Sequence, residues 1–388
     1  MAQESISNKT IAIIGGGPAG CAAAKFLSDF GFEVTLFDKG NFLRTLLPTG
    51  GGRCNLAHAE YDFKQLAKNY PRGEKFLYSL FSRFSTSQTL EFMNSLGIQT
   101  YTQEDNRIFP TSNSASEVRE KFLKSISNVH KIKEEVLELS RLENCYKIKT
   151  NKSTYAFDVV VVAIGGHAGT KLLKDLNIKI ISQTKSLVGL ITEKDFSEIS
   201  GVSLKNVKVK LGKTILQENV LFTHKGISGP LIYKISSIKA RDNMPYALRF
   251  RFLEDFDLQD LLNKNPHKSI KNLLGNLVPK SFAQYLLKEL NIEEETECHK
   301  INGKIRDKIY FALTDFEIKI TAKANEGEVV TCGGVDLKEV NSKTLEAKNY
   351  PNLYFCGEIL DIDGFCGGFN LQNCWTTGFI VAESICSK

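Results

Sequence analysis

The amino-acid sequence predicts an α/β fold, in which a parallel sheet covered by helices carries an inserted antiparallel β-rich part and a small helical part. Three observations predict it. Residues 10–38 read as a strand, a glycine turn, a helix and a second strand. Residues 186–256 alternate apolar and polar side chains, which is typical of half-buried antiparallel strands. Residues 257–311 have helical periodicity, and their prolines suit helix boundaries.

The first stretch carries a dinucleotide-binding pattern. Residues 11–14 are a continuous apolar run, as expected for a parallel strand that is buried on both faces. Gly15, Gly17 and Gly20 follow in GxGxxG register, which permits a tight turn, the approach of a pyrophosphate, and close packing of helix on strand. Asp38 ends the second strand, where an acid can accept hydrogen bonds from a ribose. Strand, turn, helix, strand and acid occur in order, so the sequence predicts a bound dinucleotide.

The composition is that of a globular protein of roughly two to three domains. The 388 residues are 42% hydrophobic and 24% charged, which argues against a disordered chain. The net charge of +6 is mild and no dense basic tract occurs, so we expect no nucleic-acid partner. No apolar run approaches the roughly 20 residues that span a bilayer, so we expect no membrane association. The polar N-terminus lacks the apolar core of a signal peptide, which favours a cytoplasmic location.

The nine cysteines form no CxxC pair and are scattered along the chain. This spacing indicates reduced thiols rather than a disulfide framework or a zinc site. We therefore expect no metal centre.

Three further glycine-rich segments are candidates for contact with the dinucleotide. Residues 48–58 read PTGGGRCNLAH, where uncovered backbone N–H groups stand beside a cation and an amide; a flexible surface loop is the alternative. Residues 157–164 form a second apolar strand that ends in glycines, where a dinucleotide-binding chain passes the cofactor again. Residues 364–368 precede a helical pattern over 369–385, whose N-terminus would stabilise negative charge.

Together these segments resemble the bacterial FAD-dependent NAD(P)/FAD oxidoreductases of the aminoacetone oxidase or bile-acid dehydro-reductase type. The resemblance rests on GGGPAG with Asp38, and on TGGGRCNL, RIFP, VVVVAIGG, GISGP, TCGGVDLKEVNSKTLEAK and NLYFCGEILDIDGFCGGFNLQ, which occur in that order over nearly the whole chain. It implies a glutathione-reductase-type FAD-binding Rossmann domain with an inserted antiparallel β-barrel domain and a small helical domain. The implied bounds are 1–185 and 325–388 for the FAD domain, 186–256 and 312–324 for the barrel, and 257–311 for the helices.

The resemblance also implies which residues contact FAD. The predicted cofactor-binding residues are Gly15, Gly17, Pro18, Ala19, Gly20, Asp38, Lys39, Gly52, Arg53, Cys54, Asn55, Val136, Ala163, Gly165, Gly357, Glu358, Asp363, Gly368, Phe369, Asn370 and Leu371.

No catalytic residue can be assigned from the sequence. The candidate proton donors are His167, His224, Glu358 and Cys366, and a structural role explains each of them as well. The segment that follows Gly166 is shorter than in the family, so the pocket wall around His167 departs from the family pattern.

The leading hypothesis is a flavin oxidoreductase that passes a hydride between FAD and a small organic substrate, such as an enone or an amine. With a single complete dinucleotide fingerprint, NAD(P)H would have to dock transiently if it is the electron donor. Two alternatives stay open: a flavoprotein that modifies tRNA, and a non-enzymatic flavin- or NAD-binding regulator. The sequence does not predict the oligomeric state.

Overall fold

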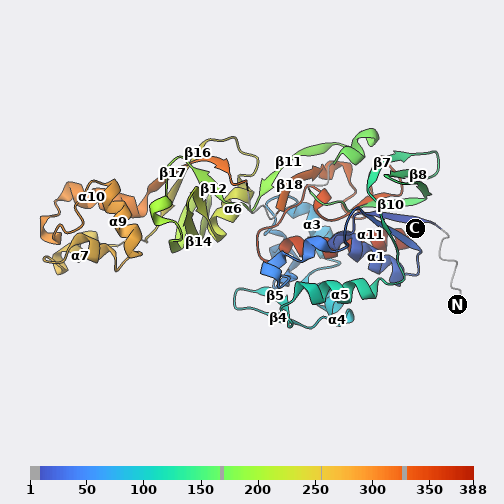
Figure 1. Cartoon of the computed structure of the whole chain (residues 1–388), viewed down its shortest axis with the longest axis horizontal. Helices are drawn as coiled ribbons and strands as arrows, with labels where there is room; N and C mark the ends of the chain where they lie inside the picture. The colour runs from blue at the N-terminus through green and yellow to red at the C-terminus, as the bar shows by residue number, and fades with distance from the viewer. Residues whose placement is uncertain (1–8, 167–169, 255, 326–329) are drawn as a thin grey trace. The chain divides into compact units, whose positions relative to one another are not determined.

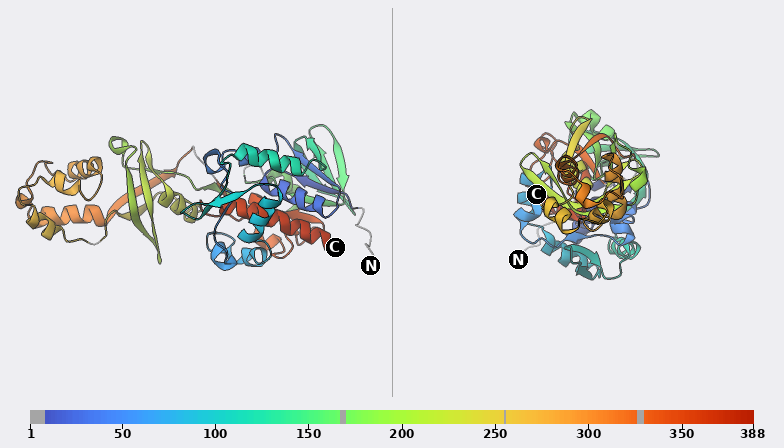
Figure 2. Two further views of the ribbon diagram at one scale, coloured as in Figure 1. Left: turned by 90° about the horizontal axis from the view of Figure 1, so that it is seen from below. Right: turned by 90° about the vertical axis from the view of Figure 1, so that its left-hand side faces the viewer.

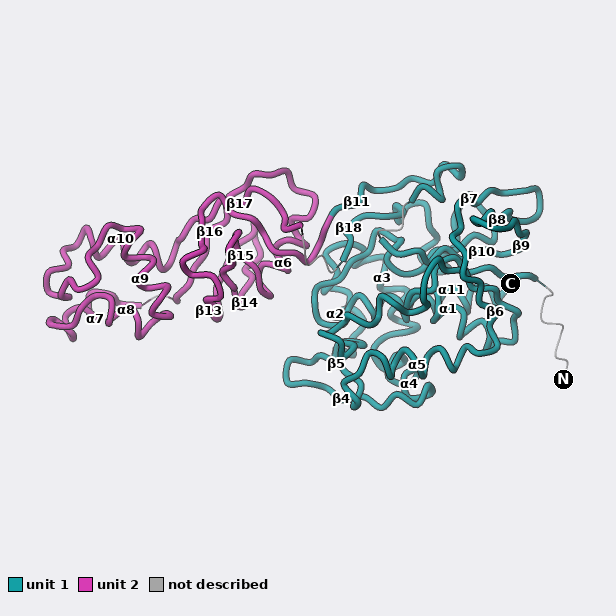
Figure 3. The backbone as a smooth tube through the Cα atoms, viewed as in Figure 1, with its two compact units in different colours: residues 1–184, 330–388 teal, residues 185–329 magenta. Residues whose placement is uncertain are grey.

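A computed structural model describes residues 9–166, 170–254, 256–325 and 330–388 of the chain (Figure 1). The chain divides into two compact units, which Figure 3 colours separately. Unit 1 contains residues 1–184 and 330–388, and unit 2 contains residues 185–329. Each unit has its own hydrophobic core, and none of the described residues belongs to both cores. Among the described residues, no helix is both long and apolar enough to cross a membrane.

Unit 1 is built on a five-stranded parallel sheet. In spatial order its strands are β19 (Leu353–Phe355), β10 (Val159–Val162), β1 (Ile11–Ile14), β2 (Val34–Asp38) and β6 (His130–Lys133). All residues of β1 and β10 are buried, as the continuous apolar runs predict for central parallel strands. Strand β19 comes from the carboxyl end of the chain, so both ends of the sequence build this sheet.

Two helices pack against each other beside the sheet. They are α1 (Pro18–Asp29) and α11 (Phe369–Cys386), which lie side by side in Figures 1 and 2. Gly378 lies at their contact, where a Cβ atom would stand 2.9 Å from the Ala19 carbonyl oxygen. The missing side chain therefore allows the two helix backbones to approach closely.

Smaller elements complete unit 1. The remaining elements are α2 (Phe63–Ala67), α3 (Glu74–Phe81), α4 (Thr86–Ser95), α5 (Ala115–Ser125), β3 (Ala57–His58), β4 (Thr100–Thr102), β5 (Arg107–Pro110), β7 (Val136–Arg141), β8 (Tyr146–Thr150), β9 (Thr154–Phe157), β11 (Ile180–Ser186) and β18 (Val330–Val335).

Unit 2 contains a closed barrel of six strands. Around the barrel they are β12 (Leu190–Thr192), β15 (Gly226–Ser228), β14 (Thr214–Thr223), β13 (Ser203–Leu211), β16 (Tyr246–Arg251) and β17 (Phe316–Lys323). All neighbouring strands of the barrel pair antiparallel, as the alternating pattern predicts. Closure leaves the barrel without an open edge.

The helices of unit 2 share the core of the barrel. They are α6 (Pro230–Ile238), α7 (Leu258–Lys264), α8 (Ile270–Leu274), α9 (Lys280–Glu289) and α10 (Gly303–Thr314). Phe222 of the barrel stacks on Phe282 of α9, with ring centroids 5.4 Å apart. This shared core keeps barrel and helices in one unit. A further division at 257 and 311 remains a prediction from the sequence.

Candidate cofactor site

The site lies at the carboxyl edge of the parallel sheet in unit 1. Strands β1, β2, β10 and β19 end there, which brings Gly15, Asp38, Gly165 and Gly357 to the same edge. In open α/β sheets this edge is where dinucleotides bind. Two glycine-rich segments complete the site: the first glycine loop, residues 49–58, and the second glycine loop, residues 364–371.

The GxGxxG turn has the geometry that its spacing predicts. Gly15 adopts φ +109°, and a Cβ atom there would lie 2.3 Å from the Ala163 carbonyl oxygen. A Cβ atom on Gly20 would lie 1.9 Å from the Gly15 oxygen, so helix and strand touch through both glycines. At Gly17 the nearest such atom is Thr45 Oγ1, 3.7 Å away. The backbone at the N-terminus of α1 is therefore open to a ligand.

Asp38 keeps hydrogen-bonding capacity toward a ligand. Its Oδ2 atom accepts from the Gly16 N–H at 2.8 Å, and its Oδ1 atom accepts from the Gly40 N–H at 2.7 Å. A carboxylate has about four acceptor positions, so two remain for ribose hydroxyls. The Lys39 ammonium instead extends to Glu135, which directly precedes Val136. Lys39 and Val136 thus lie beside the adenine-ribose end of the predicted site.

The two glycine loops pack on each other, although about 300 residues of chain separate them. The Asn55 side-chain oxygen accepts from the Gly368 N–H at 2.9 Å when its amide donates to the Ala57 carbonyl. The His58 Nδ1 atom lies 3.1 Å from the Gly367 carbonyl oxygen. Gly368 has φ +97°, and a Cβ atom there would be 2.3 Å from the Ala57 oxygen. Sequence reasoning placed both loops at the cofactor but could not show this contact.

Arg53 and Cys54 are fixed within the first glycine loop. The Arg53 guanidinium lies over the Phe109 ring, 4.2 Å from its centroid, and donates from Nε to the Gly50 carbonyl. Cys54 is buried in a left-handed conformation, with φ +67°. Burial raises the pKa of its thiol to about 12, while a hydrogen bond with Thr49 lowers it less. At neutral pH Cys54 is therefore a thiol and neither a nucleophile nor an acid of useful strength.

Helix α11 begins at the second glycine loop with its N-terminus uncapped by a side chain. The Asn370 amide instead closes the loop, accepting from the Gly364 N–H at 2.8 Å and donating to its carbonyl at 2.9 Å. The Tyr70 hydroxyl donates to the Phe369 carbonyl at 2.6 Å. The N–H groups of the first turn, together with the helix dipole, are suited to a partner with negative charge.

Two carboxylates of the predicted set hold neighbouring segments. Glu358 accepts from the backbone N–H groups of Thr331, at 2.9 Å, and Gly166, at 3.4 Å. Asp363 is fully buried and forms a two-pronged ion pair with Arg72. Both residues thus have a structural role here, and any contact of theirs with a cofactor remains a prediction.

These observations fit FAD. Four glycines around the site leave space where a side chain would stand: Gly17, Gly51, Gly52 and Gly165 have no atom closer than 3.7 Å to an added Cβ. Two helix N-termini, those of α1 and α11, are available for the pyrophosphate and for the electron-rich edge of an isoalloxazine. All the predicted cofactor-binding residues lie in unit 1, so one unit contains the whole predicted site.

The candidate proton donors are scattered. His167 lies outside the described residues. His224 is exposed in the turn between β14 and β15 of unit 2, and Cys366 is exposed in the second glycine loop. Sequence reasoning overlooked His58, whose ring packs on Phe369 with centroids 4.5 Å apart. The available signal was a titratable side chain at the end of a glycine-rich run.

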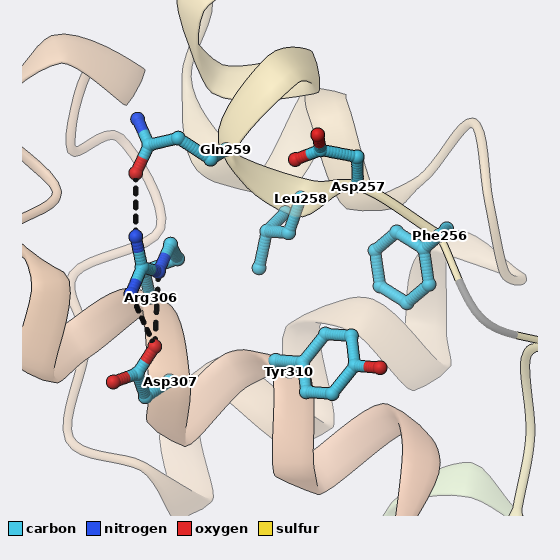
Figure 4. A pocket seen from close by; sticks show the side chains of 7 residues that line it. All are labelled: Phe256, Asp257, Leu258, Gln259, Arg306, Asp307 and Tyr310. Atoms are coloured by element: carbon cyan, nitrogen blue, oxygen red, sulfur yellow. Dashed lines mark hydrogen bonds and ion pairs between the residues drawn. The ribbon is translucent and has the colours of Figure 1, made fainter.

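Two cavities in unit 2 are separate from this site. One, of about 560 Å³, has Phe256 and Tyr310 on one side and Arg306 on the other, where Arg306 binds Gln259 and Asp307 (Figure 4). The other, of about 980 Å³, is lined by residues of the barrel and of the segments beside it, about half of them charged. None of the predicted cofactor-binding residues lines either cavity.

The chain is similar to known proteins over nearly its whole length. Residues 9–384 match the family described as HI0933-like protein Rossmann domain. The chain is 28% identical to the ribosomal RNA dihydrouridine synthase of Escherichia coli, over 96% of this chain and 97% of that protein. It is also 28% identical to the 3-dehydro-bile acid delta(4,6)-reductase of Clostridium scindens, over 97% and 99% of the two chains.

A solved structure with a similar fold is that of a 3-ketosteroid-delta4-(5alpha)-dehydrogenase from Rhodococcus jostii. The TM-score is 0.51 at 10% identity, and the match covers all of this chain and 98% of the other.

Proposed function

Because the chain belongs to the HI0933-like family and is a flavin-dependent oxidoreductase with FAD as its cofactor, we propose that it reduces a carbon–carbon double bond conjugated to a carbonyl group. The observation that carries this proposal is that the names of two relatives imply substrates with the same type of bond. A dihydrouridine synthase saturates the uracil C5=C6 bond, which is conjugated to a carbonyl, and a 3-dehydro-delta(4,6)-reductase acts on a dienone.

The chain's own residues would bind and orient the cofactor for this reaction. The α1 N-terminus and the Gly15–Gly17 turn would hold the pyrophosphate, and Asp38 would hold the adenosine ribose. FAD supplies hydride transfer when bound. The uncapped N-terminus of α11 would stabilise negative charge on the isoalloxazine edge, which makes the reduced state easier to reach.

Reduction of such a bond also needs a proton, and we propose His58 as its source. His58 is half-buried where the two glycine loops meet, and Cys54 in the same region has too high a pKa to serve. In the variant His58→Gln the reoxidation of reduced flavin by substrate should slow by roughly 10²-fold or more, the usual contribution of a general acid. Flavin content should not change. An unaltered reoxidation rate would show that another group delivers the proton.

Uridine in RNA is a second, more specific candidate for the substrate. It is favoured by the dihydrouridine synthases among the relatives, each of which matches the chain over nearly its whole length. The sequence-based expectation was a small organic substrate with no nucleic-acid partner, and the rRNA-modifying relatives keep that question open. A small enone such as a 3-keto-4,6-diene steroid is the other candidate.

One anaerobic experiment tests the reaction and compares the substrates. Flavin reduced by dithionite would be mixed with ribosomal RNA, with a 3-keto-4,6-diene steroid, or with a saturated ketone as control. We expect rapid return of the oxidised-flavin absorbance with a conjugated substrate and a product that has gained two hydrogens. If no conjugated alkene reoxidises the flavin, while an amine or alcohol reduces its oxidised form, the proposal is wrong.

We propose NADH or NADPH as a transient electron donor. The chain has one complete dinucleotide fingerprint, so such a donor would dock on the loaded protein rather than in a second Rossmann domain. Anaerobic titration with each nucleotide tests this, and bleaching of the flavin at one equivalent is the expected result. We also propose a cytoplasmic location, because the nine cysteines are scattered in the sequence and form no disulfide framework pattern.

A further inference from the structure

Unit 2 carries a cluster of metal-ligating side chains far from the cofactor residues in the sequence. His267, Glu297 and His299 each offer a ligand atom, and these atoms all lie within 4.8 Å of one another. His267 and His299 are exposed, and Glu297 is half-exposed. Two imidazoles and a carboxylate are a ligand set that zinc accepts.

The backbone brings these residues together by cross-linking two separate segments. The Cys298 N–H donates to the Lys268 carbonyl at 3.0 Å, and the His299 N–H donates to the Pro266 carbonyl at 3.0 Å. Ser269 and Glu297 form an antiparallel bridge. The Cys298 side chain is buried in the core of unit 2 and anchors its segment. Backbone hydrogen bonds therefore hold the two segments that carry these side chains next to each other.

The orientation of His299 suits metal binding. Its Nδ1 atom lies 3.0 Å from the Pro266 carbonyl oxygen, and a carbonyl can only accept. The same Nδ1 atom lies 3.3 Å from a carboxylate oxygen of Glu297, so both of its neighbours are acceptors and Nε2 is the nitrogen left to a metal. Metal-binding histidines commonly donate their second ring N–H to a backbone carbonyl in this way.

The distances require only small side-chain movements. Zinc bonds of about 2.1 Å place ligand atoms roughly 3.0–3.5 Å apart. Exposed side chains have room to close from 4.8 Å to that separation. The Lys300 ammonium lies 3.5 Å from Glu297 and is 61% exposed, so it can turn into solvent when a cation binds.

We propose that His267, Glu297 and His299 bind a zinc ion that joins the segment after α7 to the segment before α10. Three protein ligands leave the remaining coordination position to water. Because roughly 30 residues separate the two segments, such a link restricts the unfolded chain and stabilises unit 2. The site is separate from the proposed reaction and does not depend on it.

The test is calorimetric titration of the full-length, FAD-loaded and tag-free protein with zinc chloride. We expect one saturable site per chain and a rise in the melting temperature. The variants His267→Ala and His299→Ala should each weaken binding at least tenfold and abolish the rise, and Glu297→Gln should weaken binding with little change in shape. His130→Ala, at an exposed histidine in β6 of unit 1, is the matched control and should bind as the parent does.

Either of two binding results would overturn the proposal, as would the spectroscopic result given after them. One is the absence of saturable binding in a parent protein whose circular dichroism is that of a folded chain. The other is binding that survives both histidine substitutions. Cobalt chloride supplies an independent readout, because a thiolate-to-cobalt charge-transfer band would place the metal on a cysteine instead.

Discussion

At the scale of single residues, glycines with positive φ shape the loops of the candidate cofactor site. Gly15 and Gly51 both adopt left-handed values, +109° and +68°, but only Gly15 has backbone atoms where a Cβ would stand. Gly15→Ala combines strain with collision and should lower the free energy of unfolding by about 3 kcal/mol or more, with loss of FAD. Gly51→Ala carries strain alone and should cost about 1 kcal/mol. Urea unfolding of the FAD-free proteins compares the two losses of stability, and flavin absorbance measures the loss of FAD from Gly15→Ala. Equal losses of stability would contradict the argument.

The buried ion pair of Arg72 and Asp363 provides a second prediction at this scale. Asp363→Asn removes the negative charge that pairs with Arg72, whose side chain is only 12% exposed. Breaking a buried pair in this way costs about 3–5 kcal/mol. Asp315→Asn breaks the exposed pair with Arg249 and should cost less than about 1 kcal/mol. Urea denaturation of the two variants compares them, and similar losses would show that burial does not decide the cost.

At the scale of elements, α1 and α11 pack on each other, and each begins at the candidate cofactor site. In the interior of a helix, alanine gives a more favourable free energy of folding than glycine by about 1 kcal/mol. Gly378→Ala should nevertheless destabilise the protein by about 1–3 kcal/mol, because the new Cβ would lie 2.8 Å from the Ala22 Cβ and 2.9 Å from backbone atoms of α1.

Gly303→Ala in α10 is the matched control for this change. An added Cβ there meets only the end of the Arg306 side chain, at 4.0 Å. This variant should be neutral or up to about 1 kcal/mol more stable. Thermal unfolding of both variants gives the comparison, and a stabilised Gly378→Ala protein would show that the two helices have room to separate.

At the scale of the whole molecule, the sequence could predict those features that depend on the residue pattern of short segments. The run from β1 to β2, the barrel strands and the helices of unit 2 follow from apolar periodicity and glycine or proline boundaries, which are properties of short windows. The contacts that assemble the site join distant residues: Asn55 reaches Gly368, and Arg72 reaches Asp363. No periodicity records such pairs. The resemblance in motifs identified both glycine loops as candidates. Neither the motifs nor the apolar periodicity revealed where His58 lies, or that His267, Glu297 and His299 lie together.

The two separate cores predict that unit 1 can fold without unit 2. Residues 1–185 joined to 330–388 by a short glycine-serine linker retain every predicted FAD-binding residue. The junction is feasible because β11 and β18 pair with each other, and Gly333 lies against the Ser182 carbonyl. We expect cooperative urea unfolding, oxidised-flavin absorbance, and stabilisation by about 2.7 kcal/mol at FAD concentrations 100 times the Kd. The control shortens the first segment to residue 178 and so removes β11; it should unfold at lower urea concentration, because β18 then loses its partner strand. A shortened chain that aggregates or binds no flavin, while the full chain binds it, would show that unit 1 needs unit 2 to fold.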